Sequence, residues 1–471
     1  MKTLAIYGPP GTGKTRALVN LINHFKTSTL CVSFTKAAAS EIKHRLHAGV
    51  KCCTLHSLAY ADLGLDKTRI VDEGRLQDFS RMLNIPISLR QNFDDPLLVG
   101  DEYLGALSYA KHTQLSWEEA FAVKGFMGNV SEFILFAKSY EAWKKDRGFF
   151  DFDDMLVHAA GWAGKHKLIV VDEAQDLSPL QWGYLYRVIE NVKPDMVVVA
   201  GDDDQAIYEW SGADPYGMQK FVAETKAEVK VLEQSYRIPA NVYNLAVKLT
   251  DRIANRQPKE YRPRDTAGIV RESYSLPISS FAGTSSSAIL YRNHSLSEEF
   301  ADVLKGHAVP YLSSGARPSP LQSKWGRAVK VYEAACLNAD GSISAQQMQL
   351  MCRTANMGAE AVFKHIKSKT DWRRVFYSMP DQVLIYLSRL NEVYDNLAQA
   401  ESYAVQMSSI HQFKGKEADN VVLIDGMSSR TAEGYALDPD AELRVFYVGV
   451  TRAKDTLTVI PTDNALALTR F

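Results

Sequence analysis

Gly8-Pro9-Pro10-Gly11-Thr12-Gly13-Lys14-Thr15 has the spacing of a phosphate-binding loop, in which two glycines are separated by four residues and followed by lysine and threonine. The glycines let successive backbone N–H groups point at an anion, Lys14 adds a positive charge, and the Thr15 hydroxyl can ligate Mg²⁺. An apolar run at 4–7 precedes the loop, and apolar residues at helical spacing follow it from Leu18 to Phe25. This strand–loop–helix order favours a nucleotide site over a glycine-rich turn without a ligand.

Length and composition limit the classes to which the protein can belong. A chain of 471 residues suggests three or four structural units, and 46% hydrophobic with 23% charged residues is typical of globular proteins. The formal net charge is −1, so we expect any nucleic-acid binding to depend on a local groove. Five cysteines without a C-x-x-C pair argue against a metal cluster or a disulfide framework and favour a reducing, intracellular setting. We expect neither a membrane span nor a signal peptide.

The remaining apolar runs divide the chain into two α/β regions, each interrupted by a helical region. Strands are predicted at 30–34, 50–56, 167–171 and 196–200, and again at 288–291, 421–424 and 457–460. The fold class is therefore α/β with two parallel-sheet domains. The expected division is 1–65 with 150–230 as the first α/β domain, 66–149 as its helical insertion, 231–315 with 401–471 as the second α/β domain, and 316–400 as a second helical insertion.

Two of the predicted strands end in carboxylates. Asp172 and Glu173 follow the run at 167–171, at the edge where ligands bind in open parallel sheets. Asp172 is suited to hold Mg²⁺ and Glu173 to act as a general base on water. The run Asp202-Asp203-Asp204 repels phosphate and on its own indicates a surface turn, whereas the neighbouring amide of Gln205 could sense a γ-phosphate without adding charge.

Tyr208 and Trp210 follow at alternate positions in a polar segment. Two interpretations stay open at this point. The rings could be part of the hydrophobic core, or they could be stacking platforms for unpaired bases, which contribute about 1 to 3 kcal/mol per base.

Taken in order, these segments resemble the motifs of the UvrD/Rep/PcrA-type superfamily 1A DNA helicases. Beyond the segments already quoted, the resemblance rests on Phe34-Thr35, Thr54-Leu55-His56-Ser57, Asp151 to Leu156, Asp172-Glu173-Ala174-Gln175-Asp176, Gly201 to Tyr208, Leu232 to Arg237, Ser409 to Glu417 and Tyr447 to Ala453. It implies two RecA-like domains that hydrolyse ATP with Mg²⁺ in the cleft between them. It also implies that Arg237 and Arg452 reach the nucleotide from the second domain.

The resemblance also implies a role for each matching residue. As catalytic groups it implies Glu173, Arg452, Arg237 and Gln205. Around the nucleotide it implies Gly8, Gly11, Thr12, Gly13, Lys14, Thr15, Arg16, Tyr236 and Glu417. At the metal it implies Thr15 and Asp172, and along DNA it implies Phe34, Thr35, His56, Tyr208, Trp210 and His411.

The sequence departs from the family pattern in four places. The family's upstream glutamine motif is missing, so we expect adenine selection to rest on Arg16 and Tyr236. Lys36 and Ala37 replace the usual asparagine and lysine, and Ser211 stands where an arginine commonly follows the tryptophan. The insertion at 316–400 is about half the usual length of the second accessory (2B-like) domain, which predicts a reduced domain.

The function implied is that of an ATP-dependent 3′→5′ single-stranded DNA translocase and DNA helicase, that is, a DNA-dependent ATP hydrolase. The expected partners are single-stranded DNA, single-strand/duplex junctions and a loading or strand-trapping protein. The expected location is the cytoplasm of a bacterium or of a phage host. Two alternatives stay open. One is a translocase that displaces proteins without unwinding duplex, and the other is a nucleotide-gated binding protein in which hydrolysis is a timer.

Overall fold

The computed structural model describes residues 1–471 apart from 48, 89–97, 126–127, 282, 284, 316, 338–342, 463–464, 467 and 469–471, and apart from the side chain of residue 37. Contacts divide the chain into two compact units. Unit 1 consists of Met1–Ile238, Leu249–Thr266 and Asp438–Tyr447, and unit 2 consists of Pro239–Lys248, Ala267–Leu437 and Val448–Phe471. Within the described residues, no helix has the length and apolar character needed to cross a membrane.

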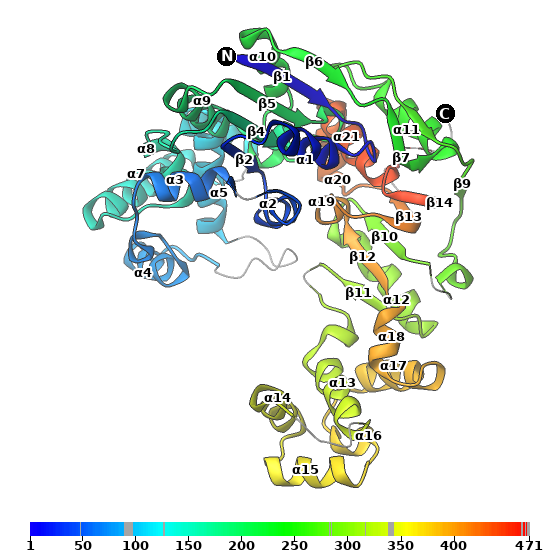
Figure 1. Ribbon diagram of the computed structural model, residues 1–471. Coiled ribbons are helices and arrows are strands. Elements are labelled where there is room, and N and C mark those ends of the chain that lie inside the picture. Colours follow the sequence, from blue (N-terminus) through cyan, green and yellow to red (C-terminus); the bar gives the residue numbers. More distant parts are fainter. Residues whose placement is uncertain are drawn as a thin grey trace. The chain divides into compact units, whose positions relative to one another are not determined.

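Unit 1 contains a six-stranded parallel sheet with the strand order β3-β2-β4-β5-β1-β6 (Figure 1). Its strands are β1 (Lys2–Tyr7), β2 (Thr29–Ser33), β3 (Val50–Cys53), β4 (Leu168–Asp172), β5 (Met196–Gly201) and β6 (Glu228–Val231). Because all six run parallel, the segments that follow β1, β4 and β5 leave the same edge of the sheet. The phosphate loop, the Asp172–Glu173 pair and the aspartate run therefore begin side by side.

Helices cover both faces of this sheet, which explains why its strands are continuous apolar runs. Along β4, Leu168 and Val170 pack into one core with helix α1, whereas Ile169 and Val171 pack into the other core. The helices of the first face are α1 (Lys14–Phe25) and α2 (Lys36–Lys43), and those of the second are α3 (Leu55–Asp62), α8 (Phe152–His158), α9 (Pro179–Val192) and α10 (Gly217–Thr225).

The segment between α3 and α8, where we expected a helical insertion at 66–149, forms four α-helices within its described residues. It forms α4 (Glu73–Leu83), α5 (Val99–Thr113), α6 (Trp117–Lys124) and α7 (Val130–Arg147). Its core is mainly aromatic, with Phe79 in contact with Phe136, Tyr140 and Trp143. The buried ammonium of Lys144 joins this core to the start of α8, because it contacts carboxylates of Asp151 and Asp154.

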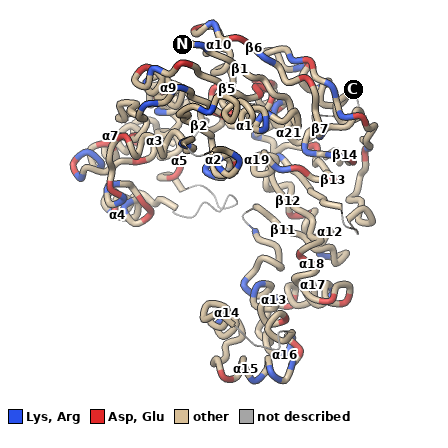
Figure 2. The backbone as a smooth tube through the Cα atoms, in the orientation of Figure 1, with Lys and Arg blue, Asp and Glu red and all other residues tan. Residues whose placement is uncertain are grey.

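Unit 2 contains a second six-stranded parallel sheet, with the order β11-β12-β10-β13-β14-β9 (Figure 1). Its strands are β9 (Ile269–Glu272), β10 (Ser287–Tyr291), β11 (Tyr311–Ser313), β12 (Val405–Ser409), β13 (Ala418–Asp425) and β14 (Ala453–Pro461). The α/β class with parallel sheets is thus confirmed. Lys and Arg are interspersed with Asp and Glu in both units (Figure 2), and their totals of 54 and 55 give the net charge of −1.

The helices of unit 2 include the second insertion. They are α12 (Ser297–Gly306), α13 (Lys324–Leu337), α14 (Ala345–Ala355), α15 (Ala359–Lys367), α16 (Trp372–Val375), α17 (Asp381–Val393), α18 (Leu397–Ser402), α19 (Ile410–Phe413) and α20 (Ser429–Leu437). One core contains both sheet residues such as Ile289 and insertion residues such as Val329 and Leu387. The reduced insertion therefore packs on its sheet and shares that core. Helices α11 (Ala240–Thr250) and α21 (Pro439–Val450) each contain residues of both units.

The structure differs from the expected elements in two places. The strand expected at 50–56 ends at Cys53, because the Thr54 hydroxyl accepts the backbone N–H of Ser57 and so caps helix α3. Residues 231–238, 249–266 and 438–447 belong to unit 1, although we expected all three segments in the second α/β domain. They include most of β7 (Gln234–Pro239), which pairs with β8 (Arg262–Arg264) in a separate two-stranded sheet.

The structure also contradicts the interpretation of the aspartate run, taken on its own, as a surface turn. Asp202, Asp203 and Asp204 are all buried, and Lys259 contacts all three of their carboxylates. Arg256 makes a bidentate pair with Asp204, at 2.8 and 2.7 Å. Burial alone would lower the pKa of Lys259, but the three carboxylates raise it, so the ammonium stays charged. The aspartate run is therefore an internal charge cluster, which we call the aspartate cluster.

Lys259→Met should destabilise unit 1 by roughly 3–5 kcal/mol, because it leaves several buried carboxylates without their shared cation. The measurement is the free energy of unfolding from urea denaturation followed by circular dichroism. Lys220→Met is the matched control, because Lys220 is mostly exposed and pairs with Asp214 at 2.6 Å, so its loss should cost at most about 1 kcal/mol. Equal stability of the two variants would contradict the internal role of Lys259.

Candidate functional site

The phosphate loop connects β1 to α1 in a conformation that suits an anion. Gly13 is the N-cap of α1 with φ 80°, and no side chain caps the helix, so its first N–H groups are directed toward the loop. Gly8 cannot carry a side chain, because a Cβ there would collide with Cγ of Lys14. The expected residues Thr12 and Thr15 also lie in this segment, where the Thr12 hydroxyl donates to Pro9 O at 2.7 Å.

Lys14 faces the carboxylates that follow β4. Its Nζ lies 3.6 Å from Glu173 Oε2. Burial lowers the pKa of Lys14, but Glu173, Asp202 and Asp172 raise it by a larger amount, so the ammonium remains charged. A bound phosphate would compete with Glu173 for the same ammonium, and its binding would release the Glu173 carboxylate.

Glu173 has φ 55° and ψ 43°, which is a left-handed conformation that residues other than glycine rarely adopt. The same conformation at Lys26, Lys193 and Lys226 is that of an ordinary helix C-cap, whereas Glu173 precedes a 3₁₀ turn. Strain of this kind costs on the order of 1–3 kcal/mol and clusters at active sites. It supports the assignment of Glu173 as the general base.

Asp172 is buried beside Glu173, and burial together with that neighbouring carboxylate raises the pKa of Asp172 to about 7. Its Oδ1 accepts the backbone N–H of Glu173 at 3.0 Å. A divalent cation would stabilise such a buried carboxylate, and carboxylate and hydroxyl oxygens are the ligands that Mg²⁺ prefers. Asp172 and Thr15, which lies in the first turn of α1, therefore fit a Mg²⁺ site by the chemistry of their side chains.

A chain of hydrogen bonds connects Glu173 with Gln205. Gln175 Nε2 donates to Glu173 Oε2 at 2.7 Å, and Gln175 Oε1 accepts the N–H of Asp202 at 3.0 Å. Gln205 Nε2 in turn donates to Asp202 Oδ2 at 2.7 Å. A movement of Glu173 can thus reach the segment after β5 through side chains that are held at both ends.

Strand β7 lies directly against the phosphate loop. The Ser235 hydroxyl donates to Pro10 O at 2.8 Å, and the N–H of Tyr236 donates to Gly11 O at 2.9 Å. The guanidinium of Arg16 stacks on the Tyr236 ring, 4.8 Å from its centroid, and this ring is 61% exposed. A Cβ on Gly11 would collide with Cβ of Arg237. Arg16, Tyr236 and Arg237 therefore lie next to the loop within unit 1. The expectation that Arg237 comes from the second domain is wrong, because β7 packs on the loop of unit 1.

The aromatic residues expected along DNA gather at the same sheet edge. The Phe34 ring, which follows β2, stacks on Tyr208 with centroids 5.5 Å apart and planes at 25°. Trp210 is 57% exposed, so it is not a core residue. His56 contacts the largely exposed Phe152 edge to face, at 6.0 Å.

Two further expected residues have defined surroundings. The hydroxyl of Thr35 accepts the N–H of Ala38 at 3.2 Å and so caps α2. His411 lies in α19 of unit 2, after β12.

Glu417 and Arg452 also belong to unit 2. Arg452 is buried, its Nε donates to Val448 O at 2.9 Å, and its Nη1 donates to Lys416 O at 3.4 Å. Arg452 therefore lies just after the C-terminal end of α21. Its contact with Lys416 places it beside the segment that contains the exposed Glu417. All the other expected site residues except His411 belong to unit 1.

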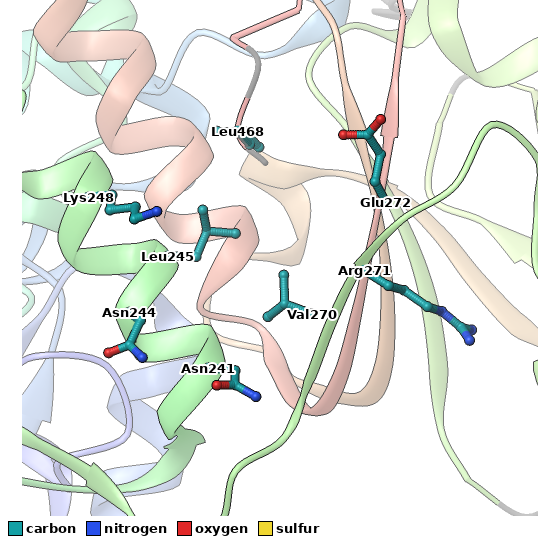
Figure 3. A pocket seen from close by; sticks show the side chains of 8 residues that line it. All are labelled: Asn241, Asn244, Leu245, Lys248, Val270, Arg271, Glu272 and Leu468. Carbon is teal, nitrogen blue, oxygen red and sulfur yellow. The ribbon is translucent and has the colours of Figure 1, made fainter. Parts of the chain in front are cut away.

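Two pockets among the described residues lie away from the expected residues. One of about 480 Å³ lies in unit 2 between α11 and β9, lined by Asn241, Asn244, Leu245, Lys248, Val270, Arg271, Glu272 and Leu468 (Figure 3). Another, of about 390 Å³, lies in the first helical insertion and is lined mainly by apolar residues. The candidate site is thus identified by its chemistry and by the sheet edge.

Comparison with known families agrees with this geometry. The UvrD/REP helicase N-terminal domain matches residues 1–226, and the UvrD-like helicase C-terminal domain matches residues 366–464. The chain belongs to the UvrD/Rep/PcrA-type helicase family. The resemblance read from its motifs is therefore confirmed.

Its relatives include the DNA helicase II of Haemophilus influenzae, 28% identical over 64% of this chain and 48% of the relative. The ATP-dependent DNA helicase UvrD2 of Mycobacterium tuberculosis is 26% identical over 94% of this chain and 74% of the relative. The chain thus spans about half of the first relative and about three quarters of the second. The solved structure of the PRRSV helicase aligns over 98% of this chain and 52% of its own, with 11% identity and a TM-score of only 0.35.

Asp172→Asn should stabilise the nucleotide-free protein, and by more at pH 8 than at pH 5. The folded-state pKa of about 7 lies above the ordinary value of 3.8, so the wild-type protein loses stability as pH rises through this range, where Asp172 must ionise while buried. One pKa unit corresponds to about 1.4 kcal/mol, so the gain at pH 8 should exceed about 1 kcal/mol. Thermal unfolding at the two pH values measures it, and a gain independent of pH would contradict the assignment.

Proposed function

We propose that this protein is an ATP-dependent 3′→5′ single-stranded DNA translocase and helicase. The observation that supports it most directly is the chain of hydrogen bonds from Glu173 through Gln175 and Asp202 to Gln205. This chain connects the candidate hydrolytic base to the segment that carries Tyr208 and Trp210. A nucleotide-dependent change at Glu173 can thereby be transmitted to the segment that contains Tyr208 and Trp210.

The phosphate loop and Lys14 would bind the triphosphate, and Asp172 with Thr15 would hold Mg²⁺. The metal supplies charge neutralisation on the phosphate oxygens. Glu173 accepts the proton of the attacking water. The Glu173 carboxylate becomes available for this role because the bound phosphate takes Lys14 as its own partner. Arg237 and Arg452 are proposed to stabilise the charge that develops in the transition state, and Glu417 to contact the ribose.

Exposed and half-buried rings next to the same sheet edge form the proposed DNA track. Trp210 and Tyr208 with Phe34 offer π-faces that accept any base, which suits a motor that moves without regard to sequence. Thr35, His56 and His411 extend the contacts. The 3′→5′ direction and the action on single-strand/duplex junctions rest on family membership.

Single-stranded DNA should stimulate ATP hydrolysis many-fold. Lys14→Ala should abolish turnover yet keep single-strand affinity, because the lysine contacts phosphate and the track is built from other residues. Glu173→Gln should bind ATP but hydrolyse it poorly, because it keeps the shape and removes the base. Steady-state ATPase with and without poly-dT, together with fluorescence anisotropy for DNA, measures all three. ATPase unaffected by DNA would favour a nucleotide-gated binding protein.

The same preparation distinguishes direction and duplex opening. Single-turnover unwinding is compared on duplexes with a 3′ or a 5′ tail, and displacement of a bound protein is followed on single strands. We expect a 3′ tail to be required, and poor unwinding of long duplexes without a loading or strand-trapping protein, because the second insertion is short. Displacement without any unwinding would favour the protein-displacing translocase.

Trp210→Ala should weaken single-strand binding by about 1–3 kcal/mol and reduce the stimulation of ATPase by DNA, because it removes a stacking platform. Stability should change little, since the side chain is mostly exposed. The measurements are anisotropy titrations with oligo-dT and thermal unfolding. A core tryptophan such as Trp143, changed in the same way, should instead cost roughly 3–5 kcal/mol of stability.

A further inference from the structure

Arg444 is one of the largest fully buried side chains within the described residues, and no motif assigns it a role. It lies in α21 and is only 1% exposed, yet it carries a permanent charge. Its Nη1 donates to Glu209 Oε1 at 2.9 Å, and its Nη2 donates to Asn255 O at 2.7 Å. A guanidinium is costly to bury, so the position of its carboxylate partner is informative.

Glu209 is the residue between Tyr208 and Trp210, the two rings of the proposed DNA platform. The Tyr208 ring is stacked on Phe34, and the Trp210 ring is exposed. A carboxylate fixed by a buried arginine therefore determines where the backbone between the two rings lies. The main-chain oxygen of Trp210 has a second anchor in Lys124 of α6, which belongs to the helical insertion.

Helix α21 makes further contacts with the segment that contains Asn255. Asp440, one turn before Arg444, accepts the N–H groups of Ala254 and Asn255 at 2.9 and 3.1 Å, so the helix is tied to the same segment that supplies Arg256 and Lys259 to the aspartate cluster. Arg452 follows two residues after α21 ends at Val450, and its Nε donates to Val448 O in the last turn of that helix. Arg444, which anchors the platform, thus lies in the middle of the helix that leads to Arg452.

We infer that Arg444 is a positioning residue that, through Glu209, couples base stacking on Tyr208 and Trp210 to helix α21 and hence to Arg452. The inference rests on the proposed function, because it needs DNA on the platform and a transition-state role for Arg452. Arg444 and Arg452 are eight residues apart on one continuous stretch formed by α21 and the turn that follows it, so the link between them is local and covalent. Lys124 anchors the platform from α6 of the helical insertion, and so provides a matched comparison.

The test compares Arg444→Met, Glu209→Gln, the double variant Glu209→Met/Arg444→Met, and Lys124→Met. ATPase is measured against poly-dT concentration, and oligo-dT affinity is measured by anisotropy. For Arg444→Met and Glu209→Gln we expect kcat at saturating DNA to fall about tenfold, with turnover without DNA within about twofold of wild type. The double variant should lose no more than the single variants, because both residues act in one link. Lys124→Met should weaken DNA affinity but keep stimulation at saturating DNA.

Glu209→Gln retains a hydrogen-bonding oxygen for Arg444, so it should fold even if Arg444→Met does not. Hydrogen exchange of residues 206–212 without ligand gives a readout independent of DNA, and it should speed up in Glu209→Gln. Equal loss of turnover with and without DNA in Glu209→Gln would indicate a purely structural role and would overturn the inference. Stimulation of Glu209→Gln by DNA to the wild-type level would overturn it as well. Equal loss of stimulation in Lys124→Met would overturn the connection through α21. A wild-type enzyme that DNA does not stimulate would refute the proposed function as well.

Discussion

Three consecutive buried carboxylates at the end of β5 require cations, and the chain supplies them from a segment that returns some fifty residues later. Lys259 contacts Asp202, Asp203 and Asp204, and Arg256 pairs with Asp204, so these two cations neutralise two of the three negative charges. Ion pairs this deep repay their desolvation only when the geometry is good and the partners are complete. The position of the segment after β5, which carries Gln205, Tyr208 and Trp210, depends on this neutralisation.

The candidate site holds groups in states that are unfavourable for stability. Asp172 is a buried acid whose pKa is raised, and Glu173 has a left-handed backbone. Lys14 compensates in part by pairing with Glu173. Such a site lowers the stability of the ligand-free protein and is stabilised when ligand binds, because phosphate and a divalent cation balance the charges that the fold leaves unbalanced. Nucleotide binding should accordingly be accompanied by a substantial gain in local order.

The sequence predicted the parts of the site whose signal is local. The phosphate loop, the apolar strands and the carboxylates at their ends follow from spacing and periodicity, and parallel pairing then brings them to one edge. The contacts of Lys259, Arg256 and Arg444 could not be predicted in this way. Each is a single charge in an ordinary polar stretch, and its partner is fixed only by tertiary packing. The interpretation of residues 202–204 as a surface turn was wrong for the same reason, since the cations that pair with these aspartates lie far along the chain. Only the structure shows that the Trp210 ring is mostly exposed and not part of the core.

The way in which the chain alternates between the two compact units has a practical consequence. Each unit is built from three separate segments, and helices α11 and α21 contain residues of both. No single truncation can therefore produce either unit intact. A fragment ending after residue 238 would lack Lys259 and Arg256 and would leave the aspartate cluster uncompensated. Dissection of this protein into independently folding pieces would require re-joining distant segments, and split or permuted versions should be designed with all of these segments retained.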